Sequence, residues 1–298
     1  MKNCRSASLA LLFAFVCMSC TSAFGQEKIT IPRVPAPNQT VKMKIVQDVQ
    51  MEMNMSGGAA VPGLGGPTKM RMKSVSTATQ KIGATNAAGI TTVEMTIEES
   101  TVEATMNGQP MPSPSNVVVG KTATLSVDKE GKVVDVKVPP DFGGAADTYA
   151  QLLKSVWGNV PTTPLAVGEE ASAASDIALP LPVGAGNTPK ATGQNKYKLV
   201  SIDKDPDGSR IAHFDFTTES SMVNGFQAPV LIPGRQMDVN VKILGTGSVF
   251  HNLDKGFLKS SEIKSTLSGT MDMGGGGALP NLPTTVTAVI ISTINPVN

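Results

Sequence analysis

The strongest pattern in this chain is a regular alternation of hydrophobic and polar residues. Residues 41–55 place apolar side chains on most odd positions and polar ones on most even positions. The same period of two returns at 93–106, 123–138, 237–243 and 263–273. Because successive side chains of a strand point to opposite faces, this period predicts long, half-buried, antiparallel β-strands.

Two interruptions of the alternation predict local features. The apolar phase runs through Val93, Met95 and Ile97, and it then moves to Val102, Ala104 and Met106. Such a shift requires a β-bulge, which we place near Glu98–Ser100. Farther on, the sequence "DKEGK" separates two alternating segments. It predicts a hairpin whose turn contains Gly131.

One segment follows helical spacing instead. In "GGAADTYAQLLKSVWGN" the apolar residues recur at intervals of three or four, and Gly158 follows them. This pattern predicts one amphipathic helix near residues 144–157. We expect it to pack on the sheet through Tyr149, Leu153 and Trp157.

The remaining segments suggest a simple domain organisation. Prolines near the start of the chain predict an extended arm over residues 26–40, and residues 41–298 read as a single β-rich domain. Within that domain, "ITTVEMTIEESTV" aligns without gaps to "IAHFDFTTESSMV". This similarity predicts a degenerate internal repeat, about 70–138 and 195–273, that flanks the helix.

The N-terminus has the three parts of a secretory signal peptide. Lys2 and Arg5 precede an apolar run, and small residues follow up to Gly25. We expect cleavage near Gly25 and a secreted or periplasmic mature protein. The alternative is a lipoprotein that is acylated at Cys20 and anchored to the outer membrane. All three cysteines precede Gly25, so the cleaved chain would have neither disulfides nor cysteine-bound zinc.

Charge and hydropathy exclude several classes of partner. Removal of the two cations Lys2 and Arg5 lowers the formal net charge from +1 to −1, so no electrostatic argument favours nucleic acid or an anionic membrane. No later segment has the roughly 18 consecutive apolar residues of a transmembrane helix. An outer-membrane barrel is a less favoured alternative, because a chain with 4% aromatic residues is poorly suited to form aromatic girdles.

Catalytic motifs are missing from the sequence. It has no Gly-x-Ser-x-Gly elbow, and the glycine runs lack the Lys-Ser/Thr of a phosphate loop. His213 and His251 have no neighbours typical of a general base. We therefore predict no catalytic residue, no cofactor and no enzymatic activity.

Methionines on the apolar phase of the strands are the candidate binding residues. These methionines are Met43, Met51, Met53, Met55, Met70 and Met72. We expect them to line the interior of a curved sheet together with the helix residues Tyr149, Leu153 and Trp157. Flexible thioethers suit an ordinary core or a cavity for a hydrophobic guest. They also bind Cu(I), but their confinement to the apolar phase favours core or cavity, and no metal site is predicted.

The order of these elements resembles a family of secreted bacterial β-rich proteins known only as a domain of unknown function. The resemblance rests on the Met/Thr/Lys-rich first hairpin, "LSVDKEGKVVDVK", "PTTPLAVGEEA" and "YKLVSID". It implies no assigned activity. More distantly, the layout is similar to periplasmic lipoprotein carriers such as LolA. That resemblance implies a half-open barrel that holds acyl chains against a helix.

The sequence thus predicts an α+β, mostly β fold: a long curved antiparallel sheet or half-open barrel with one helix packed on its concave face. Strands of about 15 residues span roughly 50 Å, so bulges and glycines should bend them. The predicted function is non-enzymatic binding of a hydrophobic small molecule or lipid-like ligand in the curved sheet. A structural or adhesive cell-envelope module without ligand is the alternative, and a Met-rich Cu(I)-binding protein is less favoured.

Overall fold

The computed structural model describes residues 27–55, 67–111, 118–140, 142, 146, 149–150, 153–154, 160–178, 190–227, 236–273 and 282–297. Its strands are β1 (Thr40–Met55), β2 (Pro67–Thr85), β3 (Thr91–Met106), β4 (Gln109–Pro110), β5 (Thr122–Val127), β6 (Val133–Lys137), β7 (Glu170–Ala178), β8 (Lys190–Lys204), β9 (Arg210–Gln227), β10 (Gln236–Asn252), β11 (Phe257–Met273) and β12 (Leu282–Pro296). The prediction of a mostly β protein is confirmed.

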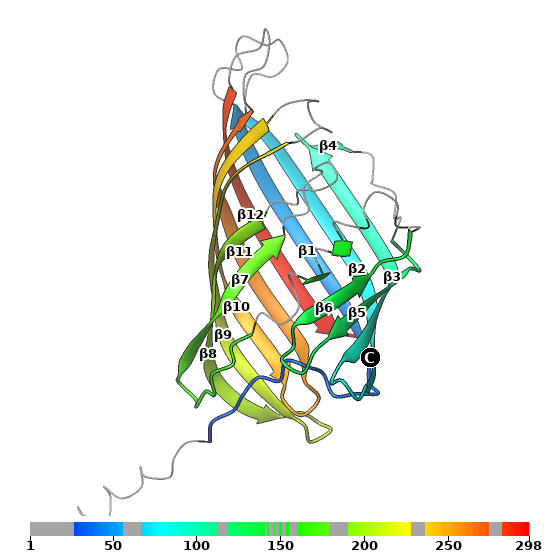
Figure 1. The fold of residues 1–298 in the computed structure, drawn as a ribbon. Coiled ribbons are helices and arrows are strands. Elements are labelled where there is room, and N and C mark those ends of the chain that lie inside the picture. Colours follow the sequence, from blue (N-terminus) through cyan, green and yellow to red (C-terminus); the bar gives the residue numbers. More distant parts are fainter. Residues whose placement is uncertain are drawn as a thin grey trace, which may run out of the picture.

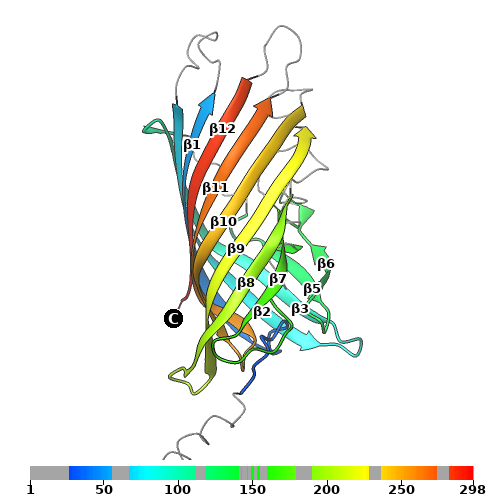
Figure 2. The ribbon, with the colours of Figure 1, turned by 90° about the vertical axis from the view of Figure 1, so that its left-hand side faces the viewer.

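All of these strands belong to one antiparallel sheet. Its order is β6-β5-β3-β2-β1-β12-β11-β10-β9-β8-β7, and the short β4 pairs with β3. Figures 1 and 2 show one continuous sheet that curves around on itself, with β5 and β6 at one margin and β7 at the other. The two margins do not pair. The predicted long curved sheet is therefore confirmed in its open form.

The first and last long strands meet in the middle of the sheet. β1 pairs with β12 from Met43↔Pro296 to Met55↔Thr284. We call this pairing of β1 with β12 the seam. Strands β1 to β6 form a meander on one side of it, and strands β7 to β12 form a meander on the other. The sheet is thus continuous only because residues far apart in the chain pair at its centre.

Two local predictions are confirmed. The pairing of β2 with β3 passes from Thr77↔Glu99 to Ala78↔Ile97, so Glu98 is the extra residue of a bulge. β5 and β6 form the predicted hairpin, and Gly131 in its turn has a φ of 79°. A positive φ of this kind favours glycine because it has no Cβ.

The helix that the sequence predicted near residues 144–157 is not supported. Within that stretch the structure describes only residues 146, 149–150 and 153–154, and no helix is among the elements that the described part of the chain defines. Spacing shows which residues would share a face, but a three-turn helix depends on tertiary packing for its stability. The described part of the fold is accordingly the curved sheet. Residues 146, 149–150 and 153–154 have helical conformation, and the rest of the predicted helix lies outside the described residues.

The predicted internal repeat can be placed on the sheet. Its two best-aligned segments fall on β3 and β9. Val93 and Phe214, which occupy equivalent positions in the alignment, are both fully buried. A regular meander produces the same arrangement without any duplication, so the repeat stays a prediction.

Glycines on the inner face allow neighbouring strands to approach closely. A Cβ on Gly269 of β11 would overlap the carbonyl oxygen of Asn240 and lie 2.7 Å from the Cα of Val241. A Cβ on Gly193 of β8 would overlap the backbone of Glu219 in the same way. Neighbouring backbones can approach this closely only where no side chain intervenes.

An N-terminal arm (residues 27–39) crosses one end of the curved sheet, where it is drawn in dark blue (Figure 1). Ile29 forms an isolated bridge with Leu165, which precedes β7. Farther along, Nη2 of Arg33 donates a hydrogen bond to the carbonyl oxygen of Val160 at 2.7 Å. The arm thereby covers the base of the sheet, which is the end opposite Met55.

Candidate functional site

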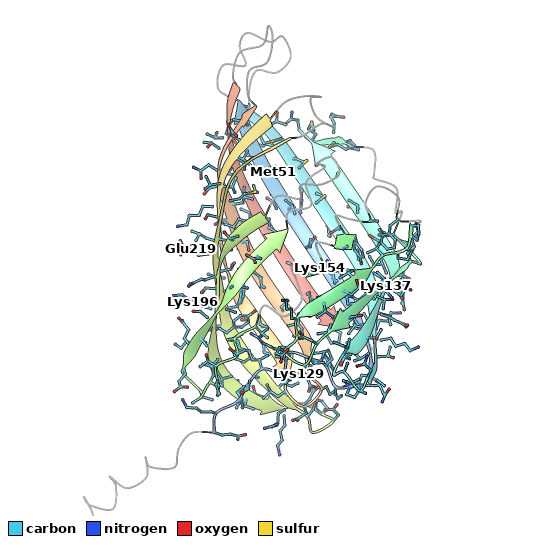
Figure 3. All side chains as sticks on the ribbon, viewed as in Figure 1. Met51, Lys129, Lys137, Lys154, Lys196 and Glu219 are labelled. Atoms are coloured by element: carbon cyan, nitrogen blue, oxygen red, sulfur yellow. The ribbon has the colours of Figure 1, made fainter. Side chains whose placement is uncertain are left out.

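The two faces of the sheet differ in chemistry. The outer face carries ion pairs between strands. Lys42 on β1 reaches across β2 to Glu98 on β3 at 2.6 Å, and Lys242 on β10 pairs with Glu219 on β9 at 2.7 Å. Such exposed pairs contribute little to stability, but they keep this face hydrated. Figure 3 shows Glu219 on the outer side of the sheet and Met51 on the inner side. We call the inner side, which carries Met43, Met51 and their cross-strand partners, the concave face.

Three methionines form a row across the concave face. Met51 on β1 is opposite Met70 on β2, and Met70 is opposite Met106 on β3. Directly opposed side chains have Cβ atoms about 5 Å apart. Met51 and Met70 are half-buried, and Met106 is 38% exposed. The row, here called the methionine row, therefore presents thioethers that the protein does not cover completely.

The other predicted methionines lie on the same face at different depths. Met72 and Met53 are half-buried, and Met72 is opposite Val49. Met43 is 6% exposed and belongs to the packed base. Met55 is opposite Thr284, but its side chain lies outside the described residues. The methionines are thus partly core and partly surface of the concave face.

The apolar surface continues beyond the seam between β1 and β12. Met51 is opposite Ala288, which is opposite Leu267, which is opposite Ile243. Ala288 is 4% exposed and Ile243 is 6% exposed. One apolar band therefore crosses the sheet from β3 to β10.

Aromatic residues close the base of the concave face. The Tyr197 ring makes edge contacts with Phe214 and Phe216, with centroids 6.0 and 5.1 Å apart. Burial raises the pKa of Tyr197 to about 12. The arm contributes Ile29 and Ile31 to the same cluster. The base is therefore a packed core, whereas the methionine row above it is only partly covered.

Two residues predicted to lie on the helix also contact the sheet. Leu153 is 7% exposed and packs with Val93 and Leu125 on the margin formed by β3 and β5. Tyr149 packs against the same cluster, its ring 5.1 Å from that of Phe142, and burial raises its pKa. Trp157 lies outside the described residues. Tyr149 and Leu153 thus belong to a second core cluster, at one margin of the concave face.

One polar pair on the concave face was missed by the sequence analysis. Asn195 on β8 is opposite Thr218 on β9, and they are 8% and 7% exposed. The Oδ1 of Asn195 and the Oγ1 of Thr218 have no hydrogen-bond partner. Each such buried atom costs about 1–3 kcal/mol. The available signal was that Asn195 occupies the apolar phase of β8, two residues before Tyr197.

Neither histidine lies near the methionine row. The ring of His213 stacks on Phe250 at 4.4 Å. His251 on β10 is 7% exposed. The β10 residue that lies level with Met72 in the pairing across the sheet is Gly245. His251 is six residues farther along the strand. Six residues of strand span about 20 Å. A Cu(I) site at these methionines would therefore have to use thioethers without an imidazole.

His251 is expected to make the stability depend on pH. Burial lowers its pKa from 6.5 to about 4. Between these values the unfolded chain takes up a proton that the folded chain does not, so the free energy of unfolding falls as the pH drops through this window. Above pH 6.5 the ring is neutral in both states and the contribution is constant.

We expect a loss of about 2 kcal/mol between about pH 6.5 and 5. Urea unfolding of the wild type and of His251→Gln across this range measures it. The variant should show a markedly flatter profile. Equal slopes for the two proteins would contradict the assignment to His251.

A separate groove of about 720 Å³ lies on the outer face of β8 to β11. Most of its lining residues occupy the polar phase; they include Gln194, Lys196, Thr217, Glu219, Thr246, Lys264 and Thr266. Lys196 and Glu219 are marked on this side in Figure 3. None of its lining residues is a methionine.

Two common kinds of site are absent from the described part of the chain. No group of three or more His, Cys, Asp or Glu side chains could hold a metal ion there. Among those residues there is also no helix with the length and hydrophobicity needed to cross a membrane.

No family model and no curated protein matches this chain. A solved structure concerning lipid–protein interactions in lipovitellin aligns with a TM-score of 0.42 and 8% identity, covering 88% of this chain and 25% of the lipovitellin chain. DynF from the dynemicin biosynthesis pathway of Micromonospora chersina aligns with a TM-score of 0.20 and 9% identity over 91% and 86% of the two chains. An outer-membrane channel from Pseudomonas putida F1 aligns with a TM-score of 0.20 and 8% identity over 88% and 97%.

This chain therefore spans about a quarter of the lipovitellin chain that it matches. Similarities at this level assign neither a family nor a function. The resemblances to a secreted bacterial family and to LolA-like carriers stay predictions.

Proposed function

We propose that this chain is a non-enzymatic, exported protein that holds a hydrophobic or lipid-like ligand against the concave face of its sheet. The observation that carries the proposal is the methionine row. Met51 and Met70 are only half-buried and Met106 is 38% exposed, although all three occupy the inner face of a curved sheet. A monomeric protein gains free energy when such inner apolar surface is covered.

The contrast between the two ends of the concave face supports the same proposal. At the base, the aromatic cluster and the arm leave Phe214 with no exposed surface. From Ile45 to Met51, toward the other end of β1, the concave face extends by about 20 Å. An extended acyl chain could lie along this length, with its end on the packed base. Each buried methylene would add about 0.8 kcal/mol.

Native mass spectrometry of protein purified from the cell envelope without detergent tests the proposal. We expect a noncovalent adduct with the mass of a lipid or another apolar metabolite. After the adduct is stripped, the protein should take up the neutral probe 1-N-phenylnaphthylamine with a rise in fluorescence. Neither adduct nor uptake would contradict ligand binding and favour the structural or adhesive envelope module.

Export is a separate part of the proposal, and it rests on the N-terminal sequence alone. The intact mass of the mature protein distinguishes its two forms. Cleavage near Gly25 gives an unmodified chain, whereas a lipoprotein would begin at an acylated Cys20. An unprocessed N-terminus would contradict both forms.

Copper remains the second candidate because three thioethers share the methionine row. Soft thioether ligands suit Cu(I). Calorimetry with Cu(I) on the wild type, Met51→Leu and Met70→Leu tests it. Binding that is lost in both variants would favour copper, and binding that is absent from the wild type would remove this candidate.

A further inference from the structure

Among the polar residues on the concave face, one cross-strand pair is buried beside the aromatic base. Asn195 and Thr218 oppose each other on β8 and β9. The pair next to them toward the base is Tyr197 and Phe216, both core residues. Because residues two apart on a strand share a face, Asn195 and Thr218 lie on the same side of the sheet as the aromatic base.

This pair is buried without being satisfied. Asn195 is 8% exposed and Thr218 is 7% exposed, yet the side-chain oxygen of each lacks a hydrogen-bond partner. The next polar pair is different, because Oγ of Ser220 donates to Oγ of Ser175 at 3.3 Å. Buried polar atoms in proteins are normally paired, so two adjacent unpaired oxygens point to a partner that is absent from the free chain.

Glycines flank the pair on the concave face. Gly245 on β10 is opposite Thr218, and a Cβ at this position would lie 2.7 Å from Cγ2 of Thr218. Any other residue there would press on the threonine side chain. On β8, Gly193 lies two residues before Asn195 on the same face. Neither glycine therefore supplies a side-chain donor or acceptor to the two oxygens.

The chemistry of the pair defines the group it would recognise. Oδ1 of Asn195 is an acceptor, and the hydroxyl of Thr218 can donate and accept. A ligand hydroxyl or amide matches both, because it donates to the asparagine and accepts from the threonine. A carboxylate does not, because it offers only acceptors. The concave positions of β8 and β9 also carry no lysine or arginine that could neutralise a carboxylate. These positions are Ala191, Gly193, Asn195, Tyr197, Leu199, Phe214, Phe216, Thr218, Ser220 and Met222.

We propose that Asn195 and Thr218 form a hydrogen-bonding point in the apolar wall that selects amphiphiles with a neutral hydroxyl or amide group, an inference that rests on the ligand-binding function proposed above. Pure hydrocarbons leave the two oxygens unpaired, and fatty acids place a negative charge beside an acceptor. The polar pair thus supplies specificity, and the methionine row supplies apolar contact.

Displacement of 1-N-phenylnaphthylamine by matched sixteen-carbon compounds tests this inference. We expect hexadecanol and palmitamide to displace the probe about tenfold better than methyl palmitate or palmitate, which is the effect of about one net hydrogen bond. The double variant Asn195→Leu/Thr218→Val keeps the side-chain volumes and removes the polar atoms. It should bind the probe as the wild type does and lose the preference.

The matched control is Asn240→Leu/Thr217→Val, because both residues are exposed on the outer face. It should retain the preference. Equal displacement by all four compounds, or a preference that persists in the concave-face variant, would overturn the inference and leave the ligand-binding function standing. Failure of every compound to displace the probe from the wild type would overturn both.

Discussion

Replacement of Met51 by glutamate is expected to weaken the uptake of 1-N-phenylnaphthylamine about 100-fold without unfolding the protein. Met51 lies at the β1 end of the methionine row, next to Ala288 of β12, and is half-buried, so a glutamate there can reach water in the free protein. In the complex its carboxylate would be desolvated against an apolar ligand, which is strongly unfavourable. A 100-fold loss corresponds to about 2.7 kcal/mol, and fluorescence titration measures it.

Gln50→Glu is the matched control, because it adds the same charge one residue away on the outer face. It should leave probe uptake unchanged. Met51→Leu keeps the apolar surface and should also bind. If Met51→Glu and Gln50→Glu weakened probe uptake equally, the ligand would not lie on the concave face. If leucine abolished binding, the thioether would be needed as a ligand atom, as copper requires.

Gly269→Ala is expected to lower the free energy of unfolding by about 3 kcal/mol or more. The new Cβ would overlap the carbonyl oxygen of Asn240 and lie 2.7 Å from Cα of Val241. Because both are backbone atoms, no side-chain rotation relieves the overlap, and β10 and β11 would have to separate locally. Steric overpacking and backbone strain account for the largest effects of single substitutions.

Gly83→Ala in β2 is the control for that prediction. Its nearest contacts would be the carbonyl oxygen and Cβ of Thr92 at 3.3 and 3.6 Å, so a small shift accommodates the methyl group. Denaturant unfolding followed by circular dichroism compares the two variants. Equal unfolding midpoints would show that the close approach of β10 and β11 at Gly269 tolerates a side chain.

The sequence predicted the features that depend on local order. Alternation identified the long strands, and its phase shift located the bulge at Glu98. Both follow from the side-chain period of two, which each strand expresses by itself. The turn at Gly131 was predictable for the same reason, because a hairpin joins neighbours in the chain.

Features that depend on pairing between distant segments could not be predicted in the same way. Alternation placed Met51, Met70 and Met106 on apolar phases, but only the register aligns them in one row. The pairing of β1 with β12 also left no local signal. The helix near residues 144–157 was inferred from spacing alone, and the described part of the chain defines no complete helix there.

The position of β12 has a consequence for the order in which the chain can fold. Until residues 282–297 have been synthesised, β1 and β11 have no partner strand between them and each presents an open edge. Such edges are templates for pairing with other chains, and closing contacts across more than 200 residues is slow. The chain would therefore consist of two half-sheets with open edges until β12 pairs with both β1 and β11.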